Sequence, residues 1–107
     1  MELKKNDLVQ YIGKLGTVHC QIDGMNCYML NFEEAYTMYC LIAQGKDITL
    51  VSKYSNDIFN EGDKVITLKG EGTIDSVDTI DENVVYGVSL EDGVHYMFRC
   101  QVWRKME

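Results

Sequence analysis

The chain has 107 residues, of which 46% are hydrophobic and 25% are charged, and this ordinary globular composition argues against a disordered chain. The formal net charge of -7 argues against tight binding to a phosphate backbone, because such binding needs lysine and arginine to displace counterions. Residues 1–56 carry six acids and five bases, whereas residues 57–107 carry eleven acids and five bases, so the second half holds most of the acidic charge.

The first half is expected to form five short strands. Proline is absent, and glycine stands mostly where the apolar alternation breaks, so glycine is predicted to supply the turns. The expected strands are residues 7–12, 17–22, 27–32, 36–42 and 48–51.

Residues 31–44 allow a second interpretation. Asn31 followed by Glu34 is a pattern typical of a helix start, and Gly45 could end that helix, so a short helix near 32–44 competes with the strand. The apolar alternation from Tyr36 to Ile42 favours the strand.

The second half repeats the plan of the first. NDLVQYIGKLGTV at residues 6–18 matches GDKVITLKGEGTI at residues 62–74 at a shift of 56 positions without a gap. In the later copy Asp63 and Gly72 are predicted to set turns, and Val65 and Ile74 to face a core. Further strands are expected at residues 64–68, 73–77, 84–90, 94–100 and 102–106, separated by turns at 70–72, 81–83 and 91–93.

A second match supports the repeat. Residues 36–40 and 96–100 share tyrosine, a large apolar residue and cysteine at the same spacing, at a shift of 60, which predicts a loop four residues longer in the second copy. The chain is therefore divided into a first repeat at 1–53, a linker at 54–60 and an acidic second repeat at 61–107. Repeats of about fifty residues are close to the smallest stable cores, so packing together or homo-oligomerisation is expected.

Five strands per copy favour a small barrel, because closing the sheet protects its edges. GDKVITLKGEGTIDSVD followed by VVYGVSLEDGVHYMFRCQVW resembles the SH3-like barrels of the KOW and Tudor type, and the Asp92-Gly93 hairpin is part of that resemblance. The resemblance covers nearly all of the second copy and, more weakly, the first, where residues 33–35 replace the Asp-Gly turn. It implies an all-β fold of two tandem SH3-like five-stranded barrels with a binding role.

No cofactor, metal or enzymatic activity is expected. The potential metal ligands are irregularly spaced and include no Cys-x-x-Cys pair, which a zinc knuckle would need. No cysteine or serine stands in a pattern that indicates activation by a base. The N-terminus lacks an apolar run of signal-peptide length, so a cytoplasmic protein with reduced, buried or partly buried thiols is expected. The residues considered as ligands are His19, Cys20, Cys27, Cys40, His95 and Cys100.

Aromatic residues are candidates for partner binding. Tyr86, Tyr96 and Trp103 are predicted as anchors, and together with Phe98 they could surround a methylated side chain in a Tudor-like cage. In the first copy the corresponding rings are Tyr28, Tyr36 and Tyr39. Packing in a core is the simpler role for aromatics at alternate strand positions.

The second repeat also carries a series of acids, which are expected along one edge of its barrel. They form either a solvated surface or a docking site for a basic protein surface, whose association an acidic field would accelerate. The predicted partner-binding acids are Glu71, Asp75, Asp78, Asp81, Glu82, Glu91 and Asp92.

The leading hypothesis is a non-catalytic protein-binding module. In size and charge the chain is similar to phage and mobile-element inhibitors, anti-CRISPR proteins among them, which often block the nucleic-acid groove of a nuclease. The alternative is a KOW-like nucleic-acid-binding or ribosome-associated protein that uses Lys4, Lys5, Lys14 and Tyr11 of the first repeat. A reader of modified peptides is the third hypothesis. Direct nucleic-acid binding is disfavoured by charge, and no membrane segment is expected.

Overall fold

The computed structural model describes residues 2–22, 24–34, 37–55 and 57–105 and shows an all-β protein with two five-stranded antiparallel sheets. The chain divides into two compact units, Met1–Tyr54 and Ser55–Glu107, which are called the first and second unit below. Among the described residues no helix is long and apolar enough to cross a membrane.

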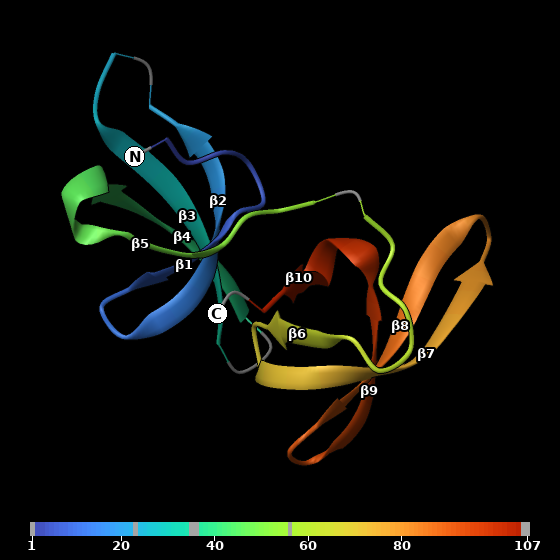
Figure 1. Cartoon of the computed structure of the whole chain (residues 1–107). Coiled ribbons are helices and arrows are strands. Elements are labelled where there is room, and N and C mark those ends of the chain that lie inside the picture. The colour runs from blue at the N-terminus through green and yellow to red at the C-terminus, as the bar shows by residue number, and fades with distance from the viewer. Residues whose placement is uncertain (1, 23, 35–36, 56, 106–107) are drawn as a thin grey trace. The chain divides into compact units, whose positions relative to one another are not determined.

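The first unit contains one sheet with the strand order β4-β3-β2-β1-β5 (Figure 1). The 3-10 turn η1 (Gly45–Asp47) joins its fourth and fifth strands. The strands are β1 (Leu8–Tyr11), β2 (Lys14–Gln21), β3 (Cys27–Glu34), β4 (Thr37–Gln44) and β5 (Thr49–Ser52).

The alternative of a helix near 32–44 is wrong. β3 and β4 pair continuously from Cys27 with Gln44 to Glu34 with Thr37, so the strand prediction for this segment is confirmed. The physical reason is the alternation along β3, which directs Leu30 and Phe32 to the core while their strand neighbours face outward. Residues 35 and 36, on which part of the prediction rested, lie outside the described residues.

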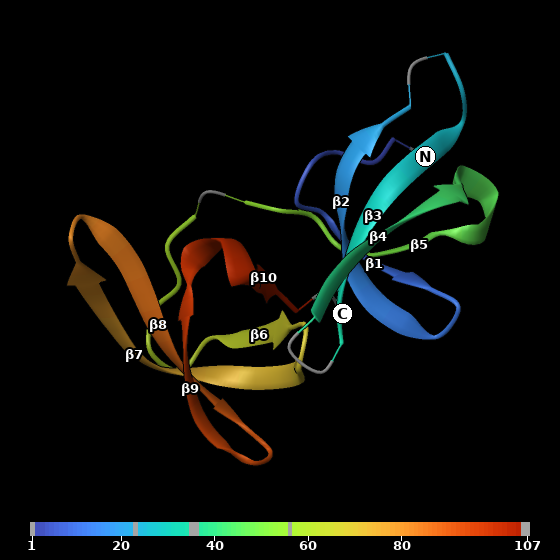
Figure 2. The same ribbon diagram turned by 180° about the vertical axis from the view of Figure 1, so that it is seen from behind.

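The second unit has the same strand order as the first when β6–β10 are set against β1–β5 (Figures 1 and 2). It also has a 3-10 turn, η2 (Arg99–Gln101), between its fourth and fifth strands. The strands are β6 (Lys64–Thr67), β7 (Gly70–Ile80), β8 (Asn83–Leu90), β9 (Gly93–Phe98) and β10 (Val102–Arg104), in the sheet order β10-β6-β7-β8-β9.

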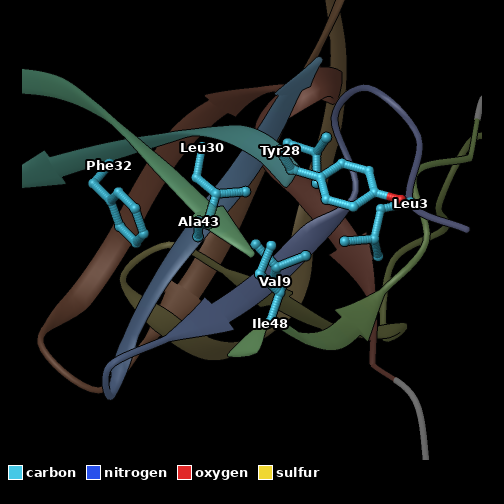
Figure 3. Close-up of a cluster of buried hydrophobic side chains, with 8 residues drawn as sticks. Leu3, Val9, Tyr28, Leu30, Phe32, Ala43 and Ile48 are labelled. Atoms are coloured by element: carbon cyan, nitrogen blue, oxygen red, sulfur yellow. The ribbon is translucent and has the colours of Figure 1, made fainter. Parts of the chain in front are cut away.

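Each unit has its own hydrophobic core. Figure 3 shows the core of the first unit, where side chains from all five strands or their flanks meet; it contains Leu3, Val9, Val18, Tyr28, Leu30, Phe32, Ala43 and Ile48. The core of the second unit contains Phe59, Val65, Ile74, Tyr86, Val88, Met97 and Val102. The prediction that Val65 and Ile74 face a core is confirmed. Phe59, which the sequence placed in a linker, belongs to the second core.

The repeated phrase builds the same turn in front of each first strand. The Asp7 carboxylate accepts a hydrogen bond from the Lys4 N–H at 2.9 Å, and the Asp63 carboxylate accepts one from the Asn60 N–H at 2.9 Å. The residue before each aspartate has a left-handed backbone conformation, with φ of 73° at Asn6 and 91° at Gly62. The predicted turn at Asp63 is therefore confirmed.

Gly72 has a different role from the predicted one. It lies within β7 and pairs with Val65, and a Cβ built on it would stand 2.7 Å from the Leu90 side chain and 2.8 Å from the Ser89 carbonyl oxygen. A Cβ built on Gly16 would likewise stand 2.7 Å from the Asn31 carbonyl oxygen. Both glycines are therefore needed because a neighbouring strand approaches closely, and neither sets a turn.

The second sequence match, which aligned residues 36–40 with residues 96–100 at a shift of 60, does not correspond to the strand pairing and is wrong. Ala43 pairs with Tyr28, and Met97 pairs with Tyr86, and all four side chains lie in the cores. Tyr28 and Ala43 are 15 positions apart (43 − 28), whereas Tyr86 and Met97 are 11 apart (97 − 86). The connection from the third to the fourth strand is thus shorter in the second unit. The fourth strands of the two units therefore correspond at a shift of 54 positions. The first residues of η1 and η2 are also 54 positions apart.

Candidate functional site

The structure does not gather the seven predicted acids along one edge. Asp81 and Glu82 form the tip of the β7–β8 hairpin, whereas Glu91 and Asp92 form the tip of the β8–β9 hairpin. The eight-residue β8 separates the two tips by about 23 Å at the usual rise per residue. The acids therefore divide into groups with different surroundings.

Glu71 and Glu91 line a hollow in the second unit that also contains two lysines. The hollow has a volume of about 420 Å³, and Lys64 and Lys105 are among its lining residues. The Lys105 Nζ lies 3.1 Å from a Glu71 carboxylate oxygen. Because the lysines offset the two carboxylates, this hollow presents little net charge.

Asp92 is paired within its own hairpin. Its carboxylate Oδ1 lies 2.7 Å from the Nε2 of His95, three residues further on. This hydrogen bond holds the pKa of the Asp92 carboxyl below its ordinary value. Asp92 therefore offers a partner less unsatisfied charge than an isolated carboxylate.

The other four acids form no salt bridge within the described part of the chain; they are Asp75, Asp78, Asp81 and Glu82. Asp75 stands where the β7–β8 register shifts, between Ile74 and Ser76. After this bulge, Asp78 pairs with Val85, on the side of the sheet opposite to the core residue Tyr86. Asp78 therefore points to the outer face.

The outer face of β9 is apolar and exposed. Val94, Tyr96 and Phe98 stand at alternate positions with exposed fractions of 47%, 73% and 54%, while Met97 between them is buried. Phe98 pairs with Val85, which in turn pairs with Asp78, so these three residues form one row across the sheet. An aromatic strip and the carboxylate of Asp78, which forms no salt bridge with any described residue, thus share one face.

The candidate site is this aromatic–acidic face of the second unit. Its members come from the end of β7, the tip of the β7–β8 hairpin and β9; they are Asp78, Ile80, Asp81, Glu82, Tyr96 and Phe98. Tyr96 is positioned by Gly87, since a Cβ built on that glycine would lie 3.4 Å from the tyrosine ring. Ile80, exposed by 56%, adds apolar surface beside the hairpin tip.

Two of the three predicted aromatic anchors are not accessible. Tyr86 is fully buried, and its hydroxyl accepts a hydrogen bond from the Phe59 N–H at 3.0 Å. Trp103 is 2% exposed. The prediction of Tyr86 and Trp103 as surface anchors is therefore wrong, and Tyr96 keeps the exposure that an anchor needs. Phe98 was not among the predicted anchors, although its alternation with Tyr96 was the signal that could have identified it.

The first unit also carries an aromatic cluster, but an internal cation already contacts it. Phe32 and Tyr39 stack at 5.6 Å between ring centroids, and Tyr11 lies 6.5 Å from Phe32. The Lys14 Nζ lies 6.0 Å from the Tyr39 ring centroid and 3.0 Å from a Glu34 carboxylate oxygen. This pair lowers the pKa of Glu34 and raises that of Lys14. Tyr28, the other described ring considered for a cage here, is buried in the core.

All four cysteines are free thiols, and their exposure differs from the expectation. Cys20, Cys40 and Cys100 are exposed, and only Cys27 is partly buried. The Cys40 thiol donates a hydrogen bond to the Asn31 side-chain oxygen at 2.9 Å. In the part of the chain that the structure describes, no three histidine, cysteine or acidic side chains gather as metal ligands.

The aromatic–acidic face combines what a protein partner would need. Exposed rings provide apolar contact area and attract cations through their faces, and the neighbouring carboxylates favour positive charge. The sequence matches no protein-family model and no curated protein.

Proposed function

We propose that the protein is a non-catalytic protein-binding module whose second unit docks on a basic protein surface through the aromatic–acidic face. The observation that carries this proposal is the exposure of Tyr96 and Phe98 on the same face as Asp78, which has no salt-bridge partner among the described residues. Exposed aromatic residues are enriched at protein interfaces, where they often contribute most of the binding energy.

Charge supports a basic partner. Residues 57–107 carry eleven acids and five bases, and such a field accelerates association with a positively charged surface. The most concrete form of the proposal is an inhibitor that occupies the nucleic-acid-binding groove of a nuclease of the CRISPR type, because such a groove is a basic protein surface. The small size and acidity of the chain support this form.

We also propose that each unit is an SH3-like barrel. The support is that both sheets have the same strand order and that a 3-10 turn joins the fourth and fifth strands in both. Barrels of this kind carry many unrelated binding roles, so the function rests on the face of the second unit rather than on the fold.

The test is affinity capture from a lysate of the source organism with three forms of the full chain. The first is wild type, the second is the Tyr96→Ser/Phe98→Ser double variant, and the third reverses charge at Asp78, Asp81 and Glu82, the acids of the face, by substitution with lysine. We expect both variants to lose the same basic proteins that the wild type retains. Circular dichroism and thermal unfolding of each variant check that the fold is intact.

A set of captured proteins that is unchanged in both folded variants would contradict the proposed function. For any basic protein that is captured, association with the wild type is expected to slow as salt rises. The charge-reversed variant is expected to associate more slowly at low salt and to show a weaker dependence on salt.

A second candidate function is nucleic-acid or ribosome-associated binding by the first unit. The observation that favours it is a hollow of about 300 Å³ whose lining includes Lys4, Lys5, Lys53 and Tyr54, although Glu2 and Asp7 also line it. Titration of labelled single- and double-stranded DNA and RNA at low salt tests it. Binding that Lys4→Glu/Lys53→Glu weakens would support this function, and no binding at low salt would exclude it.

A further inference from the structure

We infer that the partner segment of the aromatic–acidic face is an extended arginine- or lysine-bearing strand that pairs with β9 as a sixth strand of the second sheet. This inference rests on the proposed function and adds how the partner binds and what chemistry its segment has. Extended peptides commonly bind by adding a strand to an open sheet edge, where main-chain hydrogen bonds give affinity and side chains give specificity.

β9 is an edge strand. It stands last in the order β10-β6-β7-β8-β9, and β8 is its only strand partner among the described residues. Its pairing with β8 runs without a register shift over six residue pairs. β9 contains no lysine, no proline and no bulge, which are the usual features that prevent an exposed edge from pairing.

The hydrogen bond of Phe98 indicates which groups of β9 are free. The Phe98 N–H donates to the Gln101 side-chain oxygen at 3.0 Å, so it is directed away from β8. Main-chain groups in an antiparallel strand alternate in direction with a period of two residues, so the N–H and C=O groups of Val94 and Tyr96 share this outward direction. These main-chain groups can form hydrogen bonds with an added strand, whereas the Phe98 N–H is already bonded to the Gln101 side chain and cannot.

The side chains beside this edge favour a cationic strand. Alternate residues of an added strand would lie directly beside Val94 and Tyr96 on the outer face, at about the usual 4.8 Å between strands. A guanidinium at such a position can stack on an exposed tyrosine or phenylalanine ring. Asp78 lies two strands further in from β9 on the same face, so its charge adds to the negative field that a cationic strand would meet.

A second copy of the chain is the less favourable occupant. Pairing two β9 edges would bring together two copies of a half that carries eleven acids and five bases, and like charges oppose that association. The first unit offers a matched comparison, because β4 is also an edge strand with exposed apolar residues. Its half is almost neutral, with six acids and five bases.

The experiment uses a seven-residue peptide that alternates arginine and valine, with the full wild-type chain. Two further peptides are N-methylated, one at every arginine and the other at every valine. Because alternate N–H groups of a strand point in opposite directions, only one of these sets can face β9. We expect one methylated peptide to bind at least about tenfold more weakly and the other to bind within about twofold of the parent, since several main-chain hydrogen bonds are lost in only one.

Protein variants locate the binding edge. Tyr96→Ser on β9 is expected to weaken binding of the parent peptide at least about fivefold through loss of the ring. Ile42→Ser, which stands 54 positions earlier on the corresponding strand β4 and is also exposed, is expected to leave binding unchanged. A peptide that alternates glutamate and valine is expected not to bind.

Three results would overturn the proposed cationic sixth strand. They are no binding of the parent peptide, equal effects of the two methylated peptides, or a wild-type dimer in sedimentation that the peptide dissociates, which would make a second copy the occupant. The proposed function is judged separately by the capture experiment. If capture still depends on Tyr96, Phe98 and the three acids of the face while both methylated peptides bind like the parent, the docking face stands and the sixth strand is wrong.

Discussion

At the scale of single residues, the turn between β1 and β2 contains an unfavourable backbone conformation. Ile12 and Gly13 have φ of 51° and 72°, the left-handed pair that a tight two-residue hairpin requires. Glycine adopts this conformation readily, but a β-branched residue does so only at a cost. The Ile12 side chain is also 77% exposed, so it gains little from packing.

Ile12→Asn is therefore expected to stabilise the protein. Asparagine followed by glycine is the preferred pair for this turn, and the free energy of unfolding should rise by about 1 kcal/mol. Urea denaturation measures it. Ile58→Asn is the control, because Ile58 is 56% exposed but does not have a positive φ. This substitution should change the free energy of unfolding by no more than about 0.5 kcal/mol. Equal effects of both substitutions, or a loss of stability in Ile12→Asn, would contradict the role of the turn.

At the scale of strands, the sequence pattern predicted the number of strands and the core positions of Val65 and Ile74, but not the face of each side chain. Val65 and Ile74, which are predicted to face the core from their places in the repeated phrase, do belong to it. Tyr86 and Tyr96 both alternate with apolar neighbours, and only the β8–β9 register shows that one faces the core and the other faces outward. The bulge at Asp75 changes which residues of β7 face the core, and the sequence pattern does not show this either.

Two other differences have local causes. Phe59 follows a polar stretch without strand alternation, so nothing in the pattern distinguishes it from a linker residue, although it is buried against Tyr86 at 5.6 Å between ring centroids. The match at a shift of 60 arose because tyrosine and apolar residues recur at alternate positions in any half-exposed strand. Pairing partners, which the sequence does not contain explicitly, decide the true correspondence.

The contact that joins β2, β3 and β4 in the first unit has a measurable pH signature. Because the hydrogen bond from Lys14 lowers the pKa of Glu34 in the folded state, it contributes stability above the ordinary glutamate pKa of about 4.3. That contribution is lost as the pH falls through the lowered folded value. The stability of the folded protein should therefore fall with decreasing pH in this range, as expected when folding stabilises a carboxylate in its charged form.

Lys14→Met is expected to raise the pKa of Glu34 toward its ordinary value. Titration of the Glu34 side-chain carboxyl by NMR, in the wild type and in this variant, measures the change. Lys46→Met, which removes a lysine outside this contact, serves as the control and should leave the Glu34 midpoint unchanged. An identical Glu34 midpoint in the wild type and in Lys14→Met would show that the contact is not formed in solution.

At the scale of the whole molecule, two units share one strand order and differ in their surfaces. The shared parts are structural, because the aspartate turn and the close-packed glycine occur in both units. The differences lie in the outward residues, where the second unit has Tyr96 and Phe98 on β9, and acids on β7 and its hairpin tip that form no salt bridge within the described residues. The proposed partner binding therefore rests on these surface residues, which differ between the two units.

The most direct test of the proposed docking face is a solution NMR titration of the full chain with the arginine–valine peptide. We expect the largest amide shift changes at Val94, Tyr96 and Phe98 on β9 and at Asp78 and Ile80 on β7, and we expect these changes to shrink as salt is added. Changes confined to the hollow lined by Lys64 and Lys105, or to residues of the first unit, would contradict it.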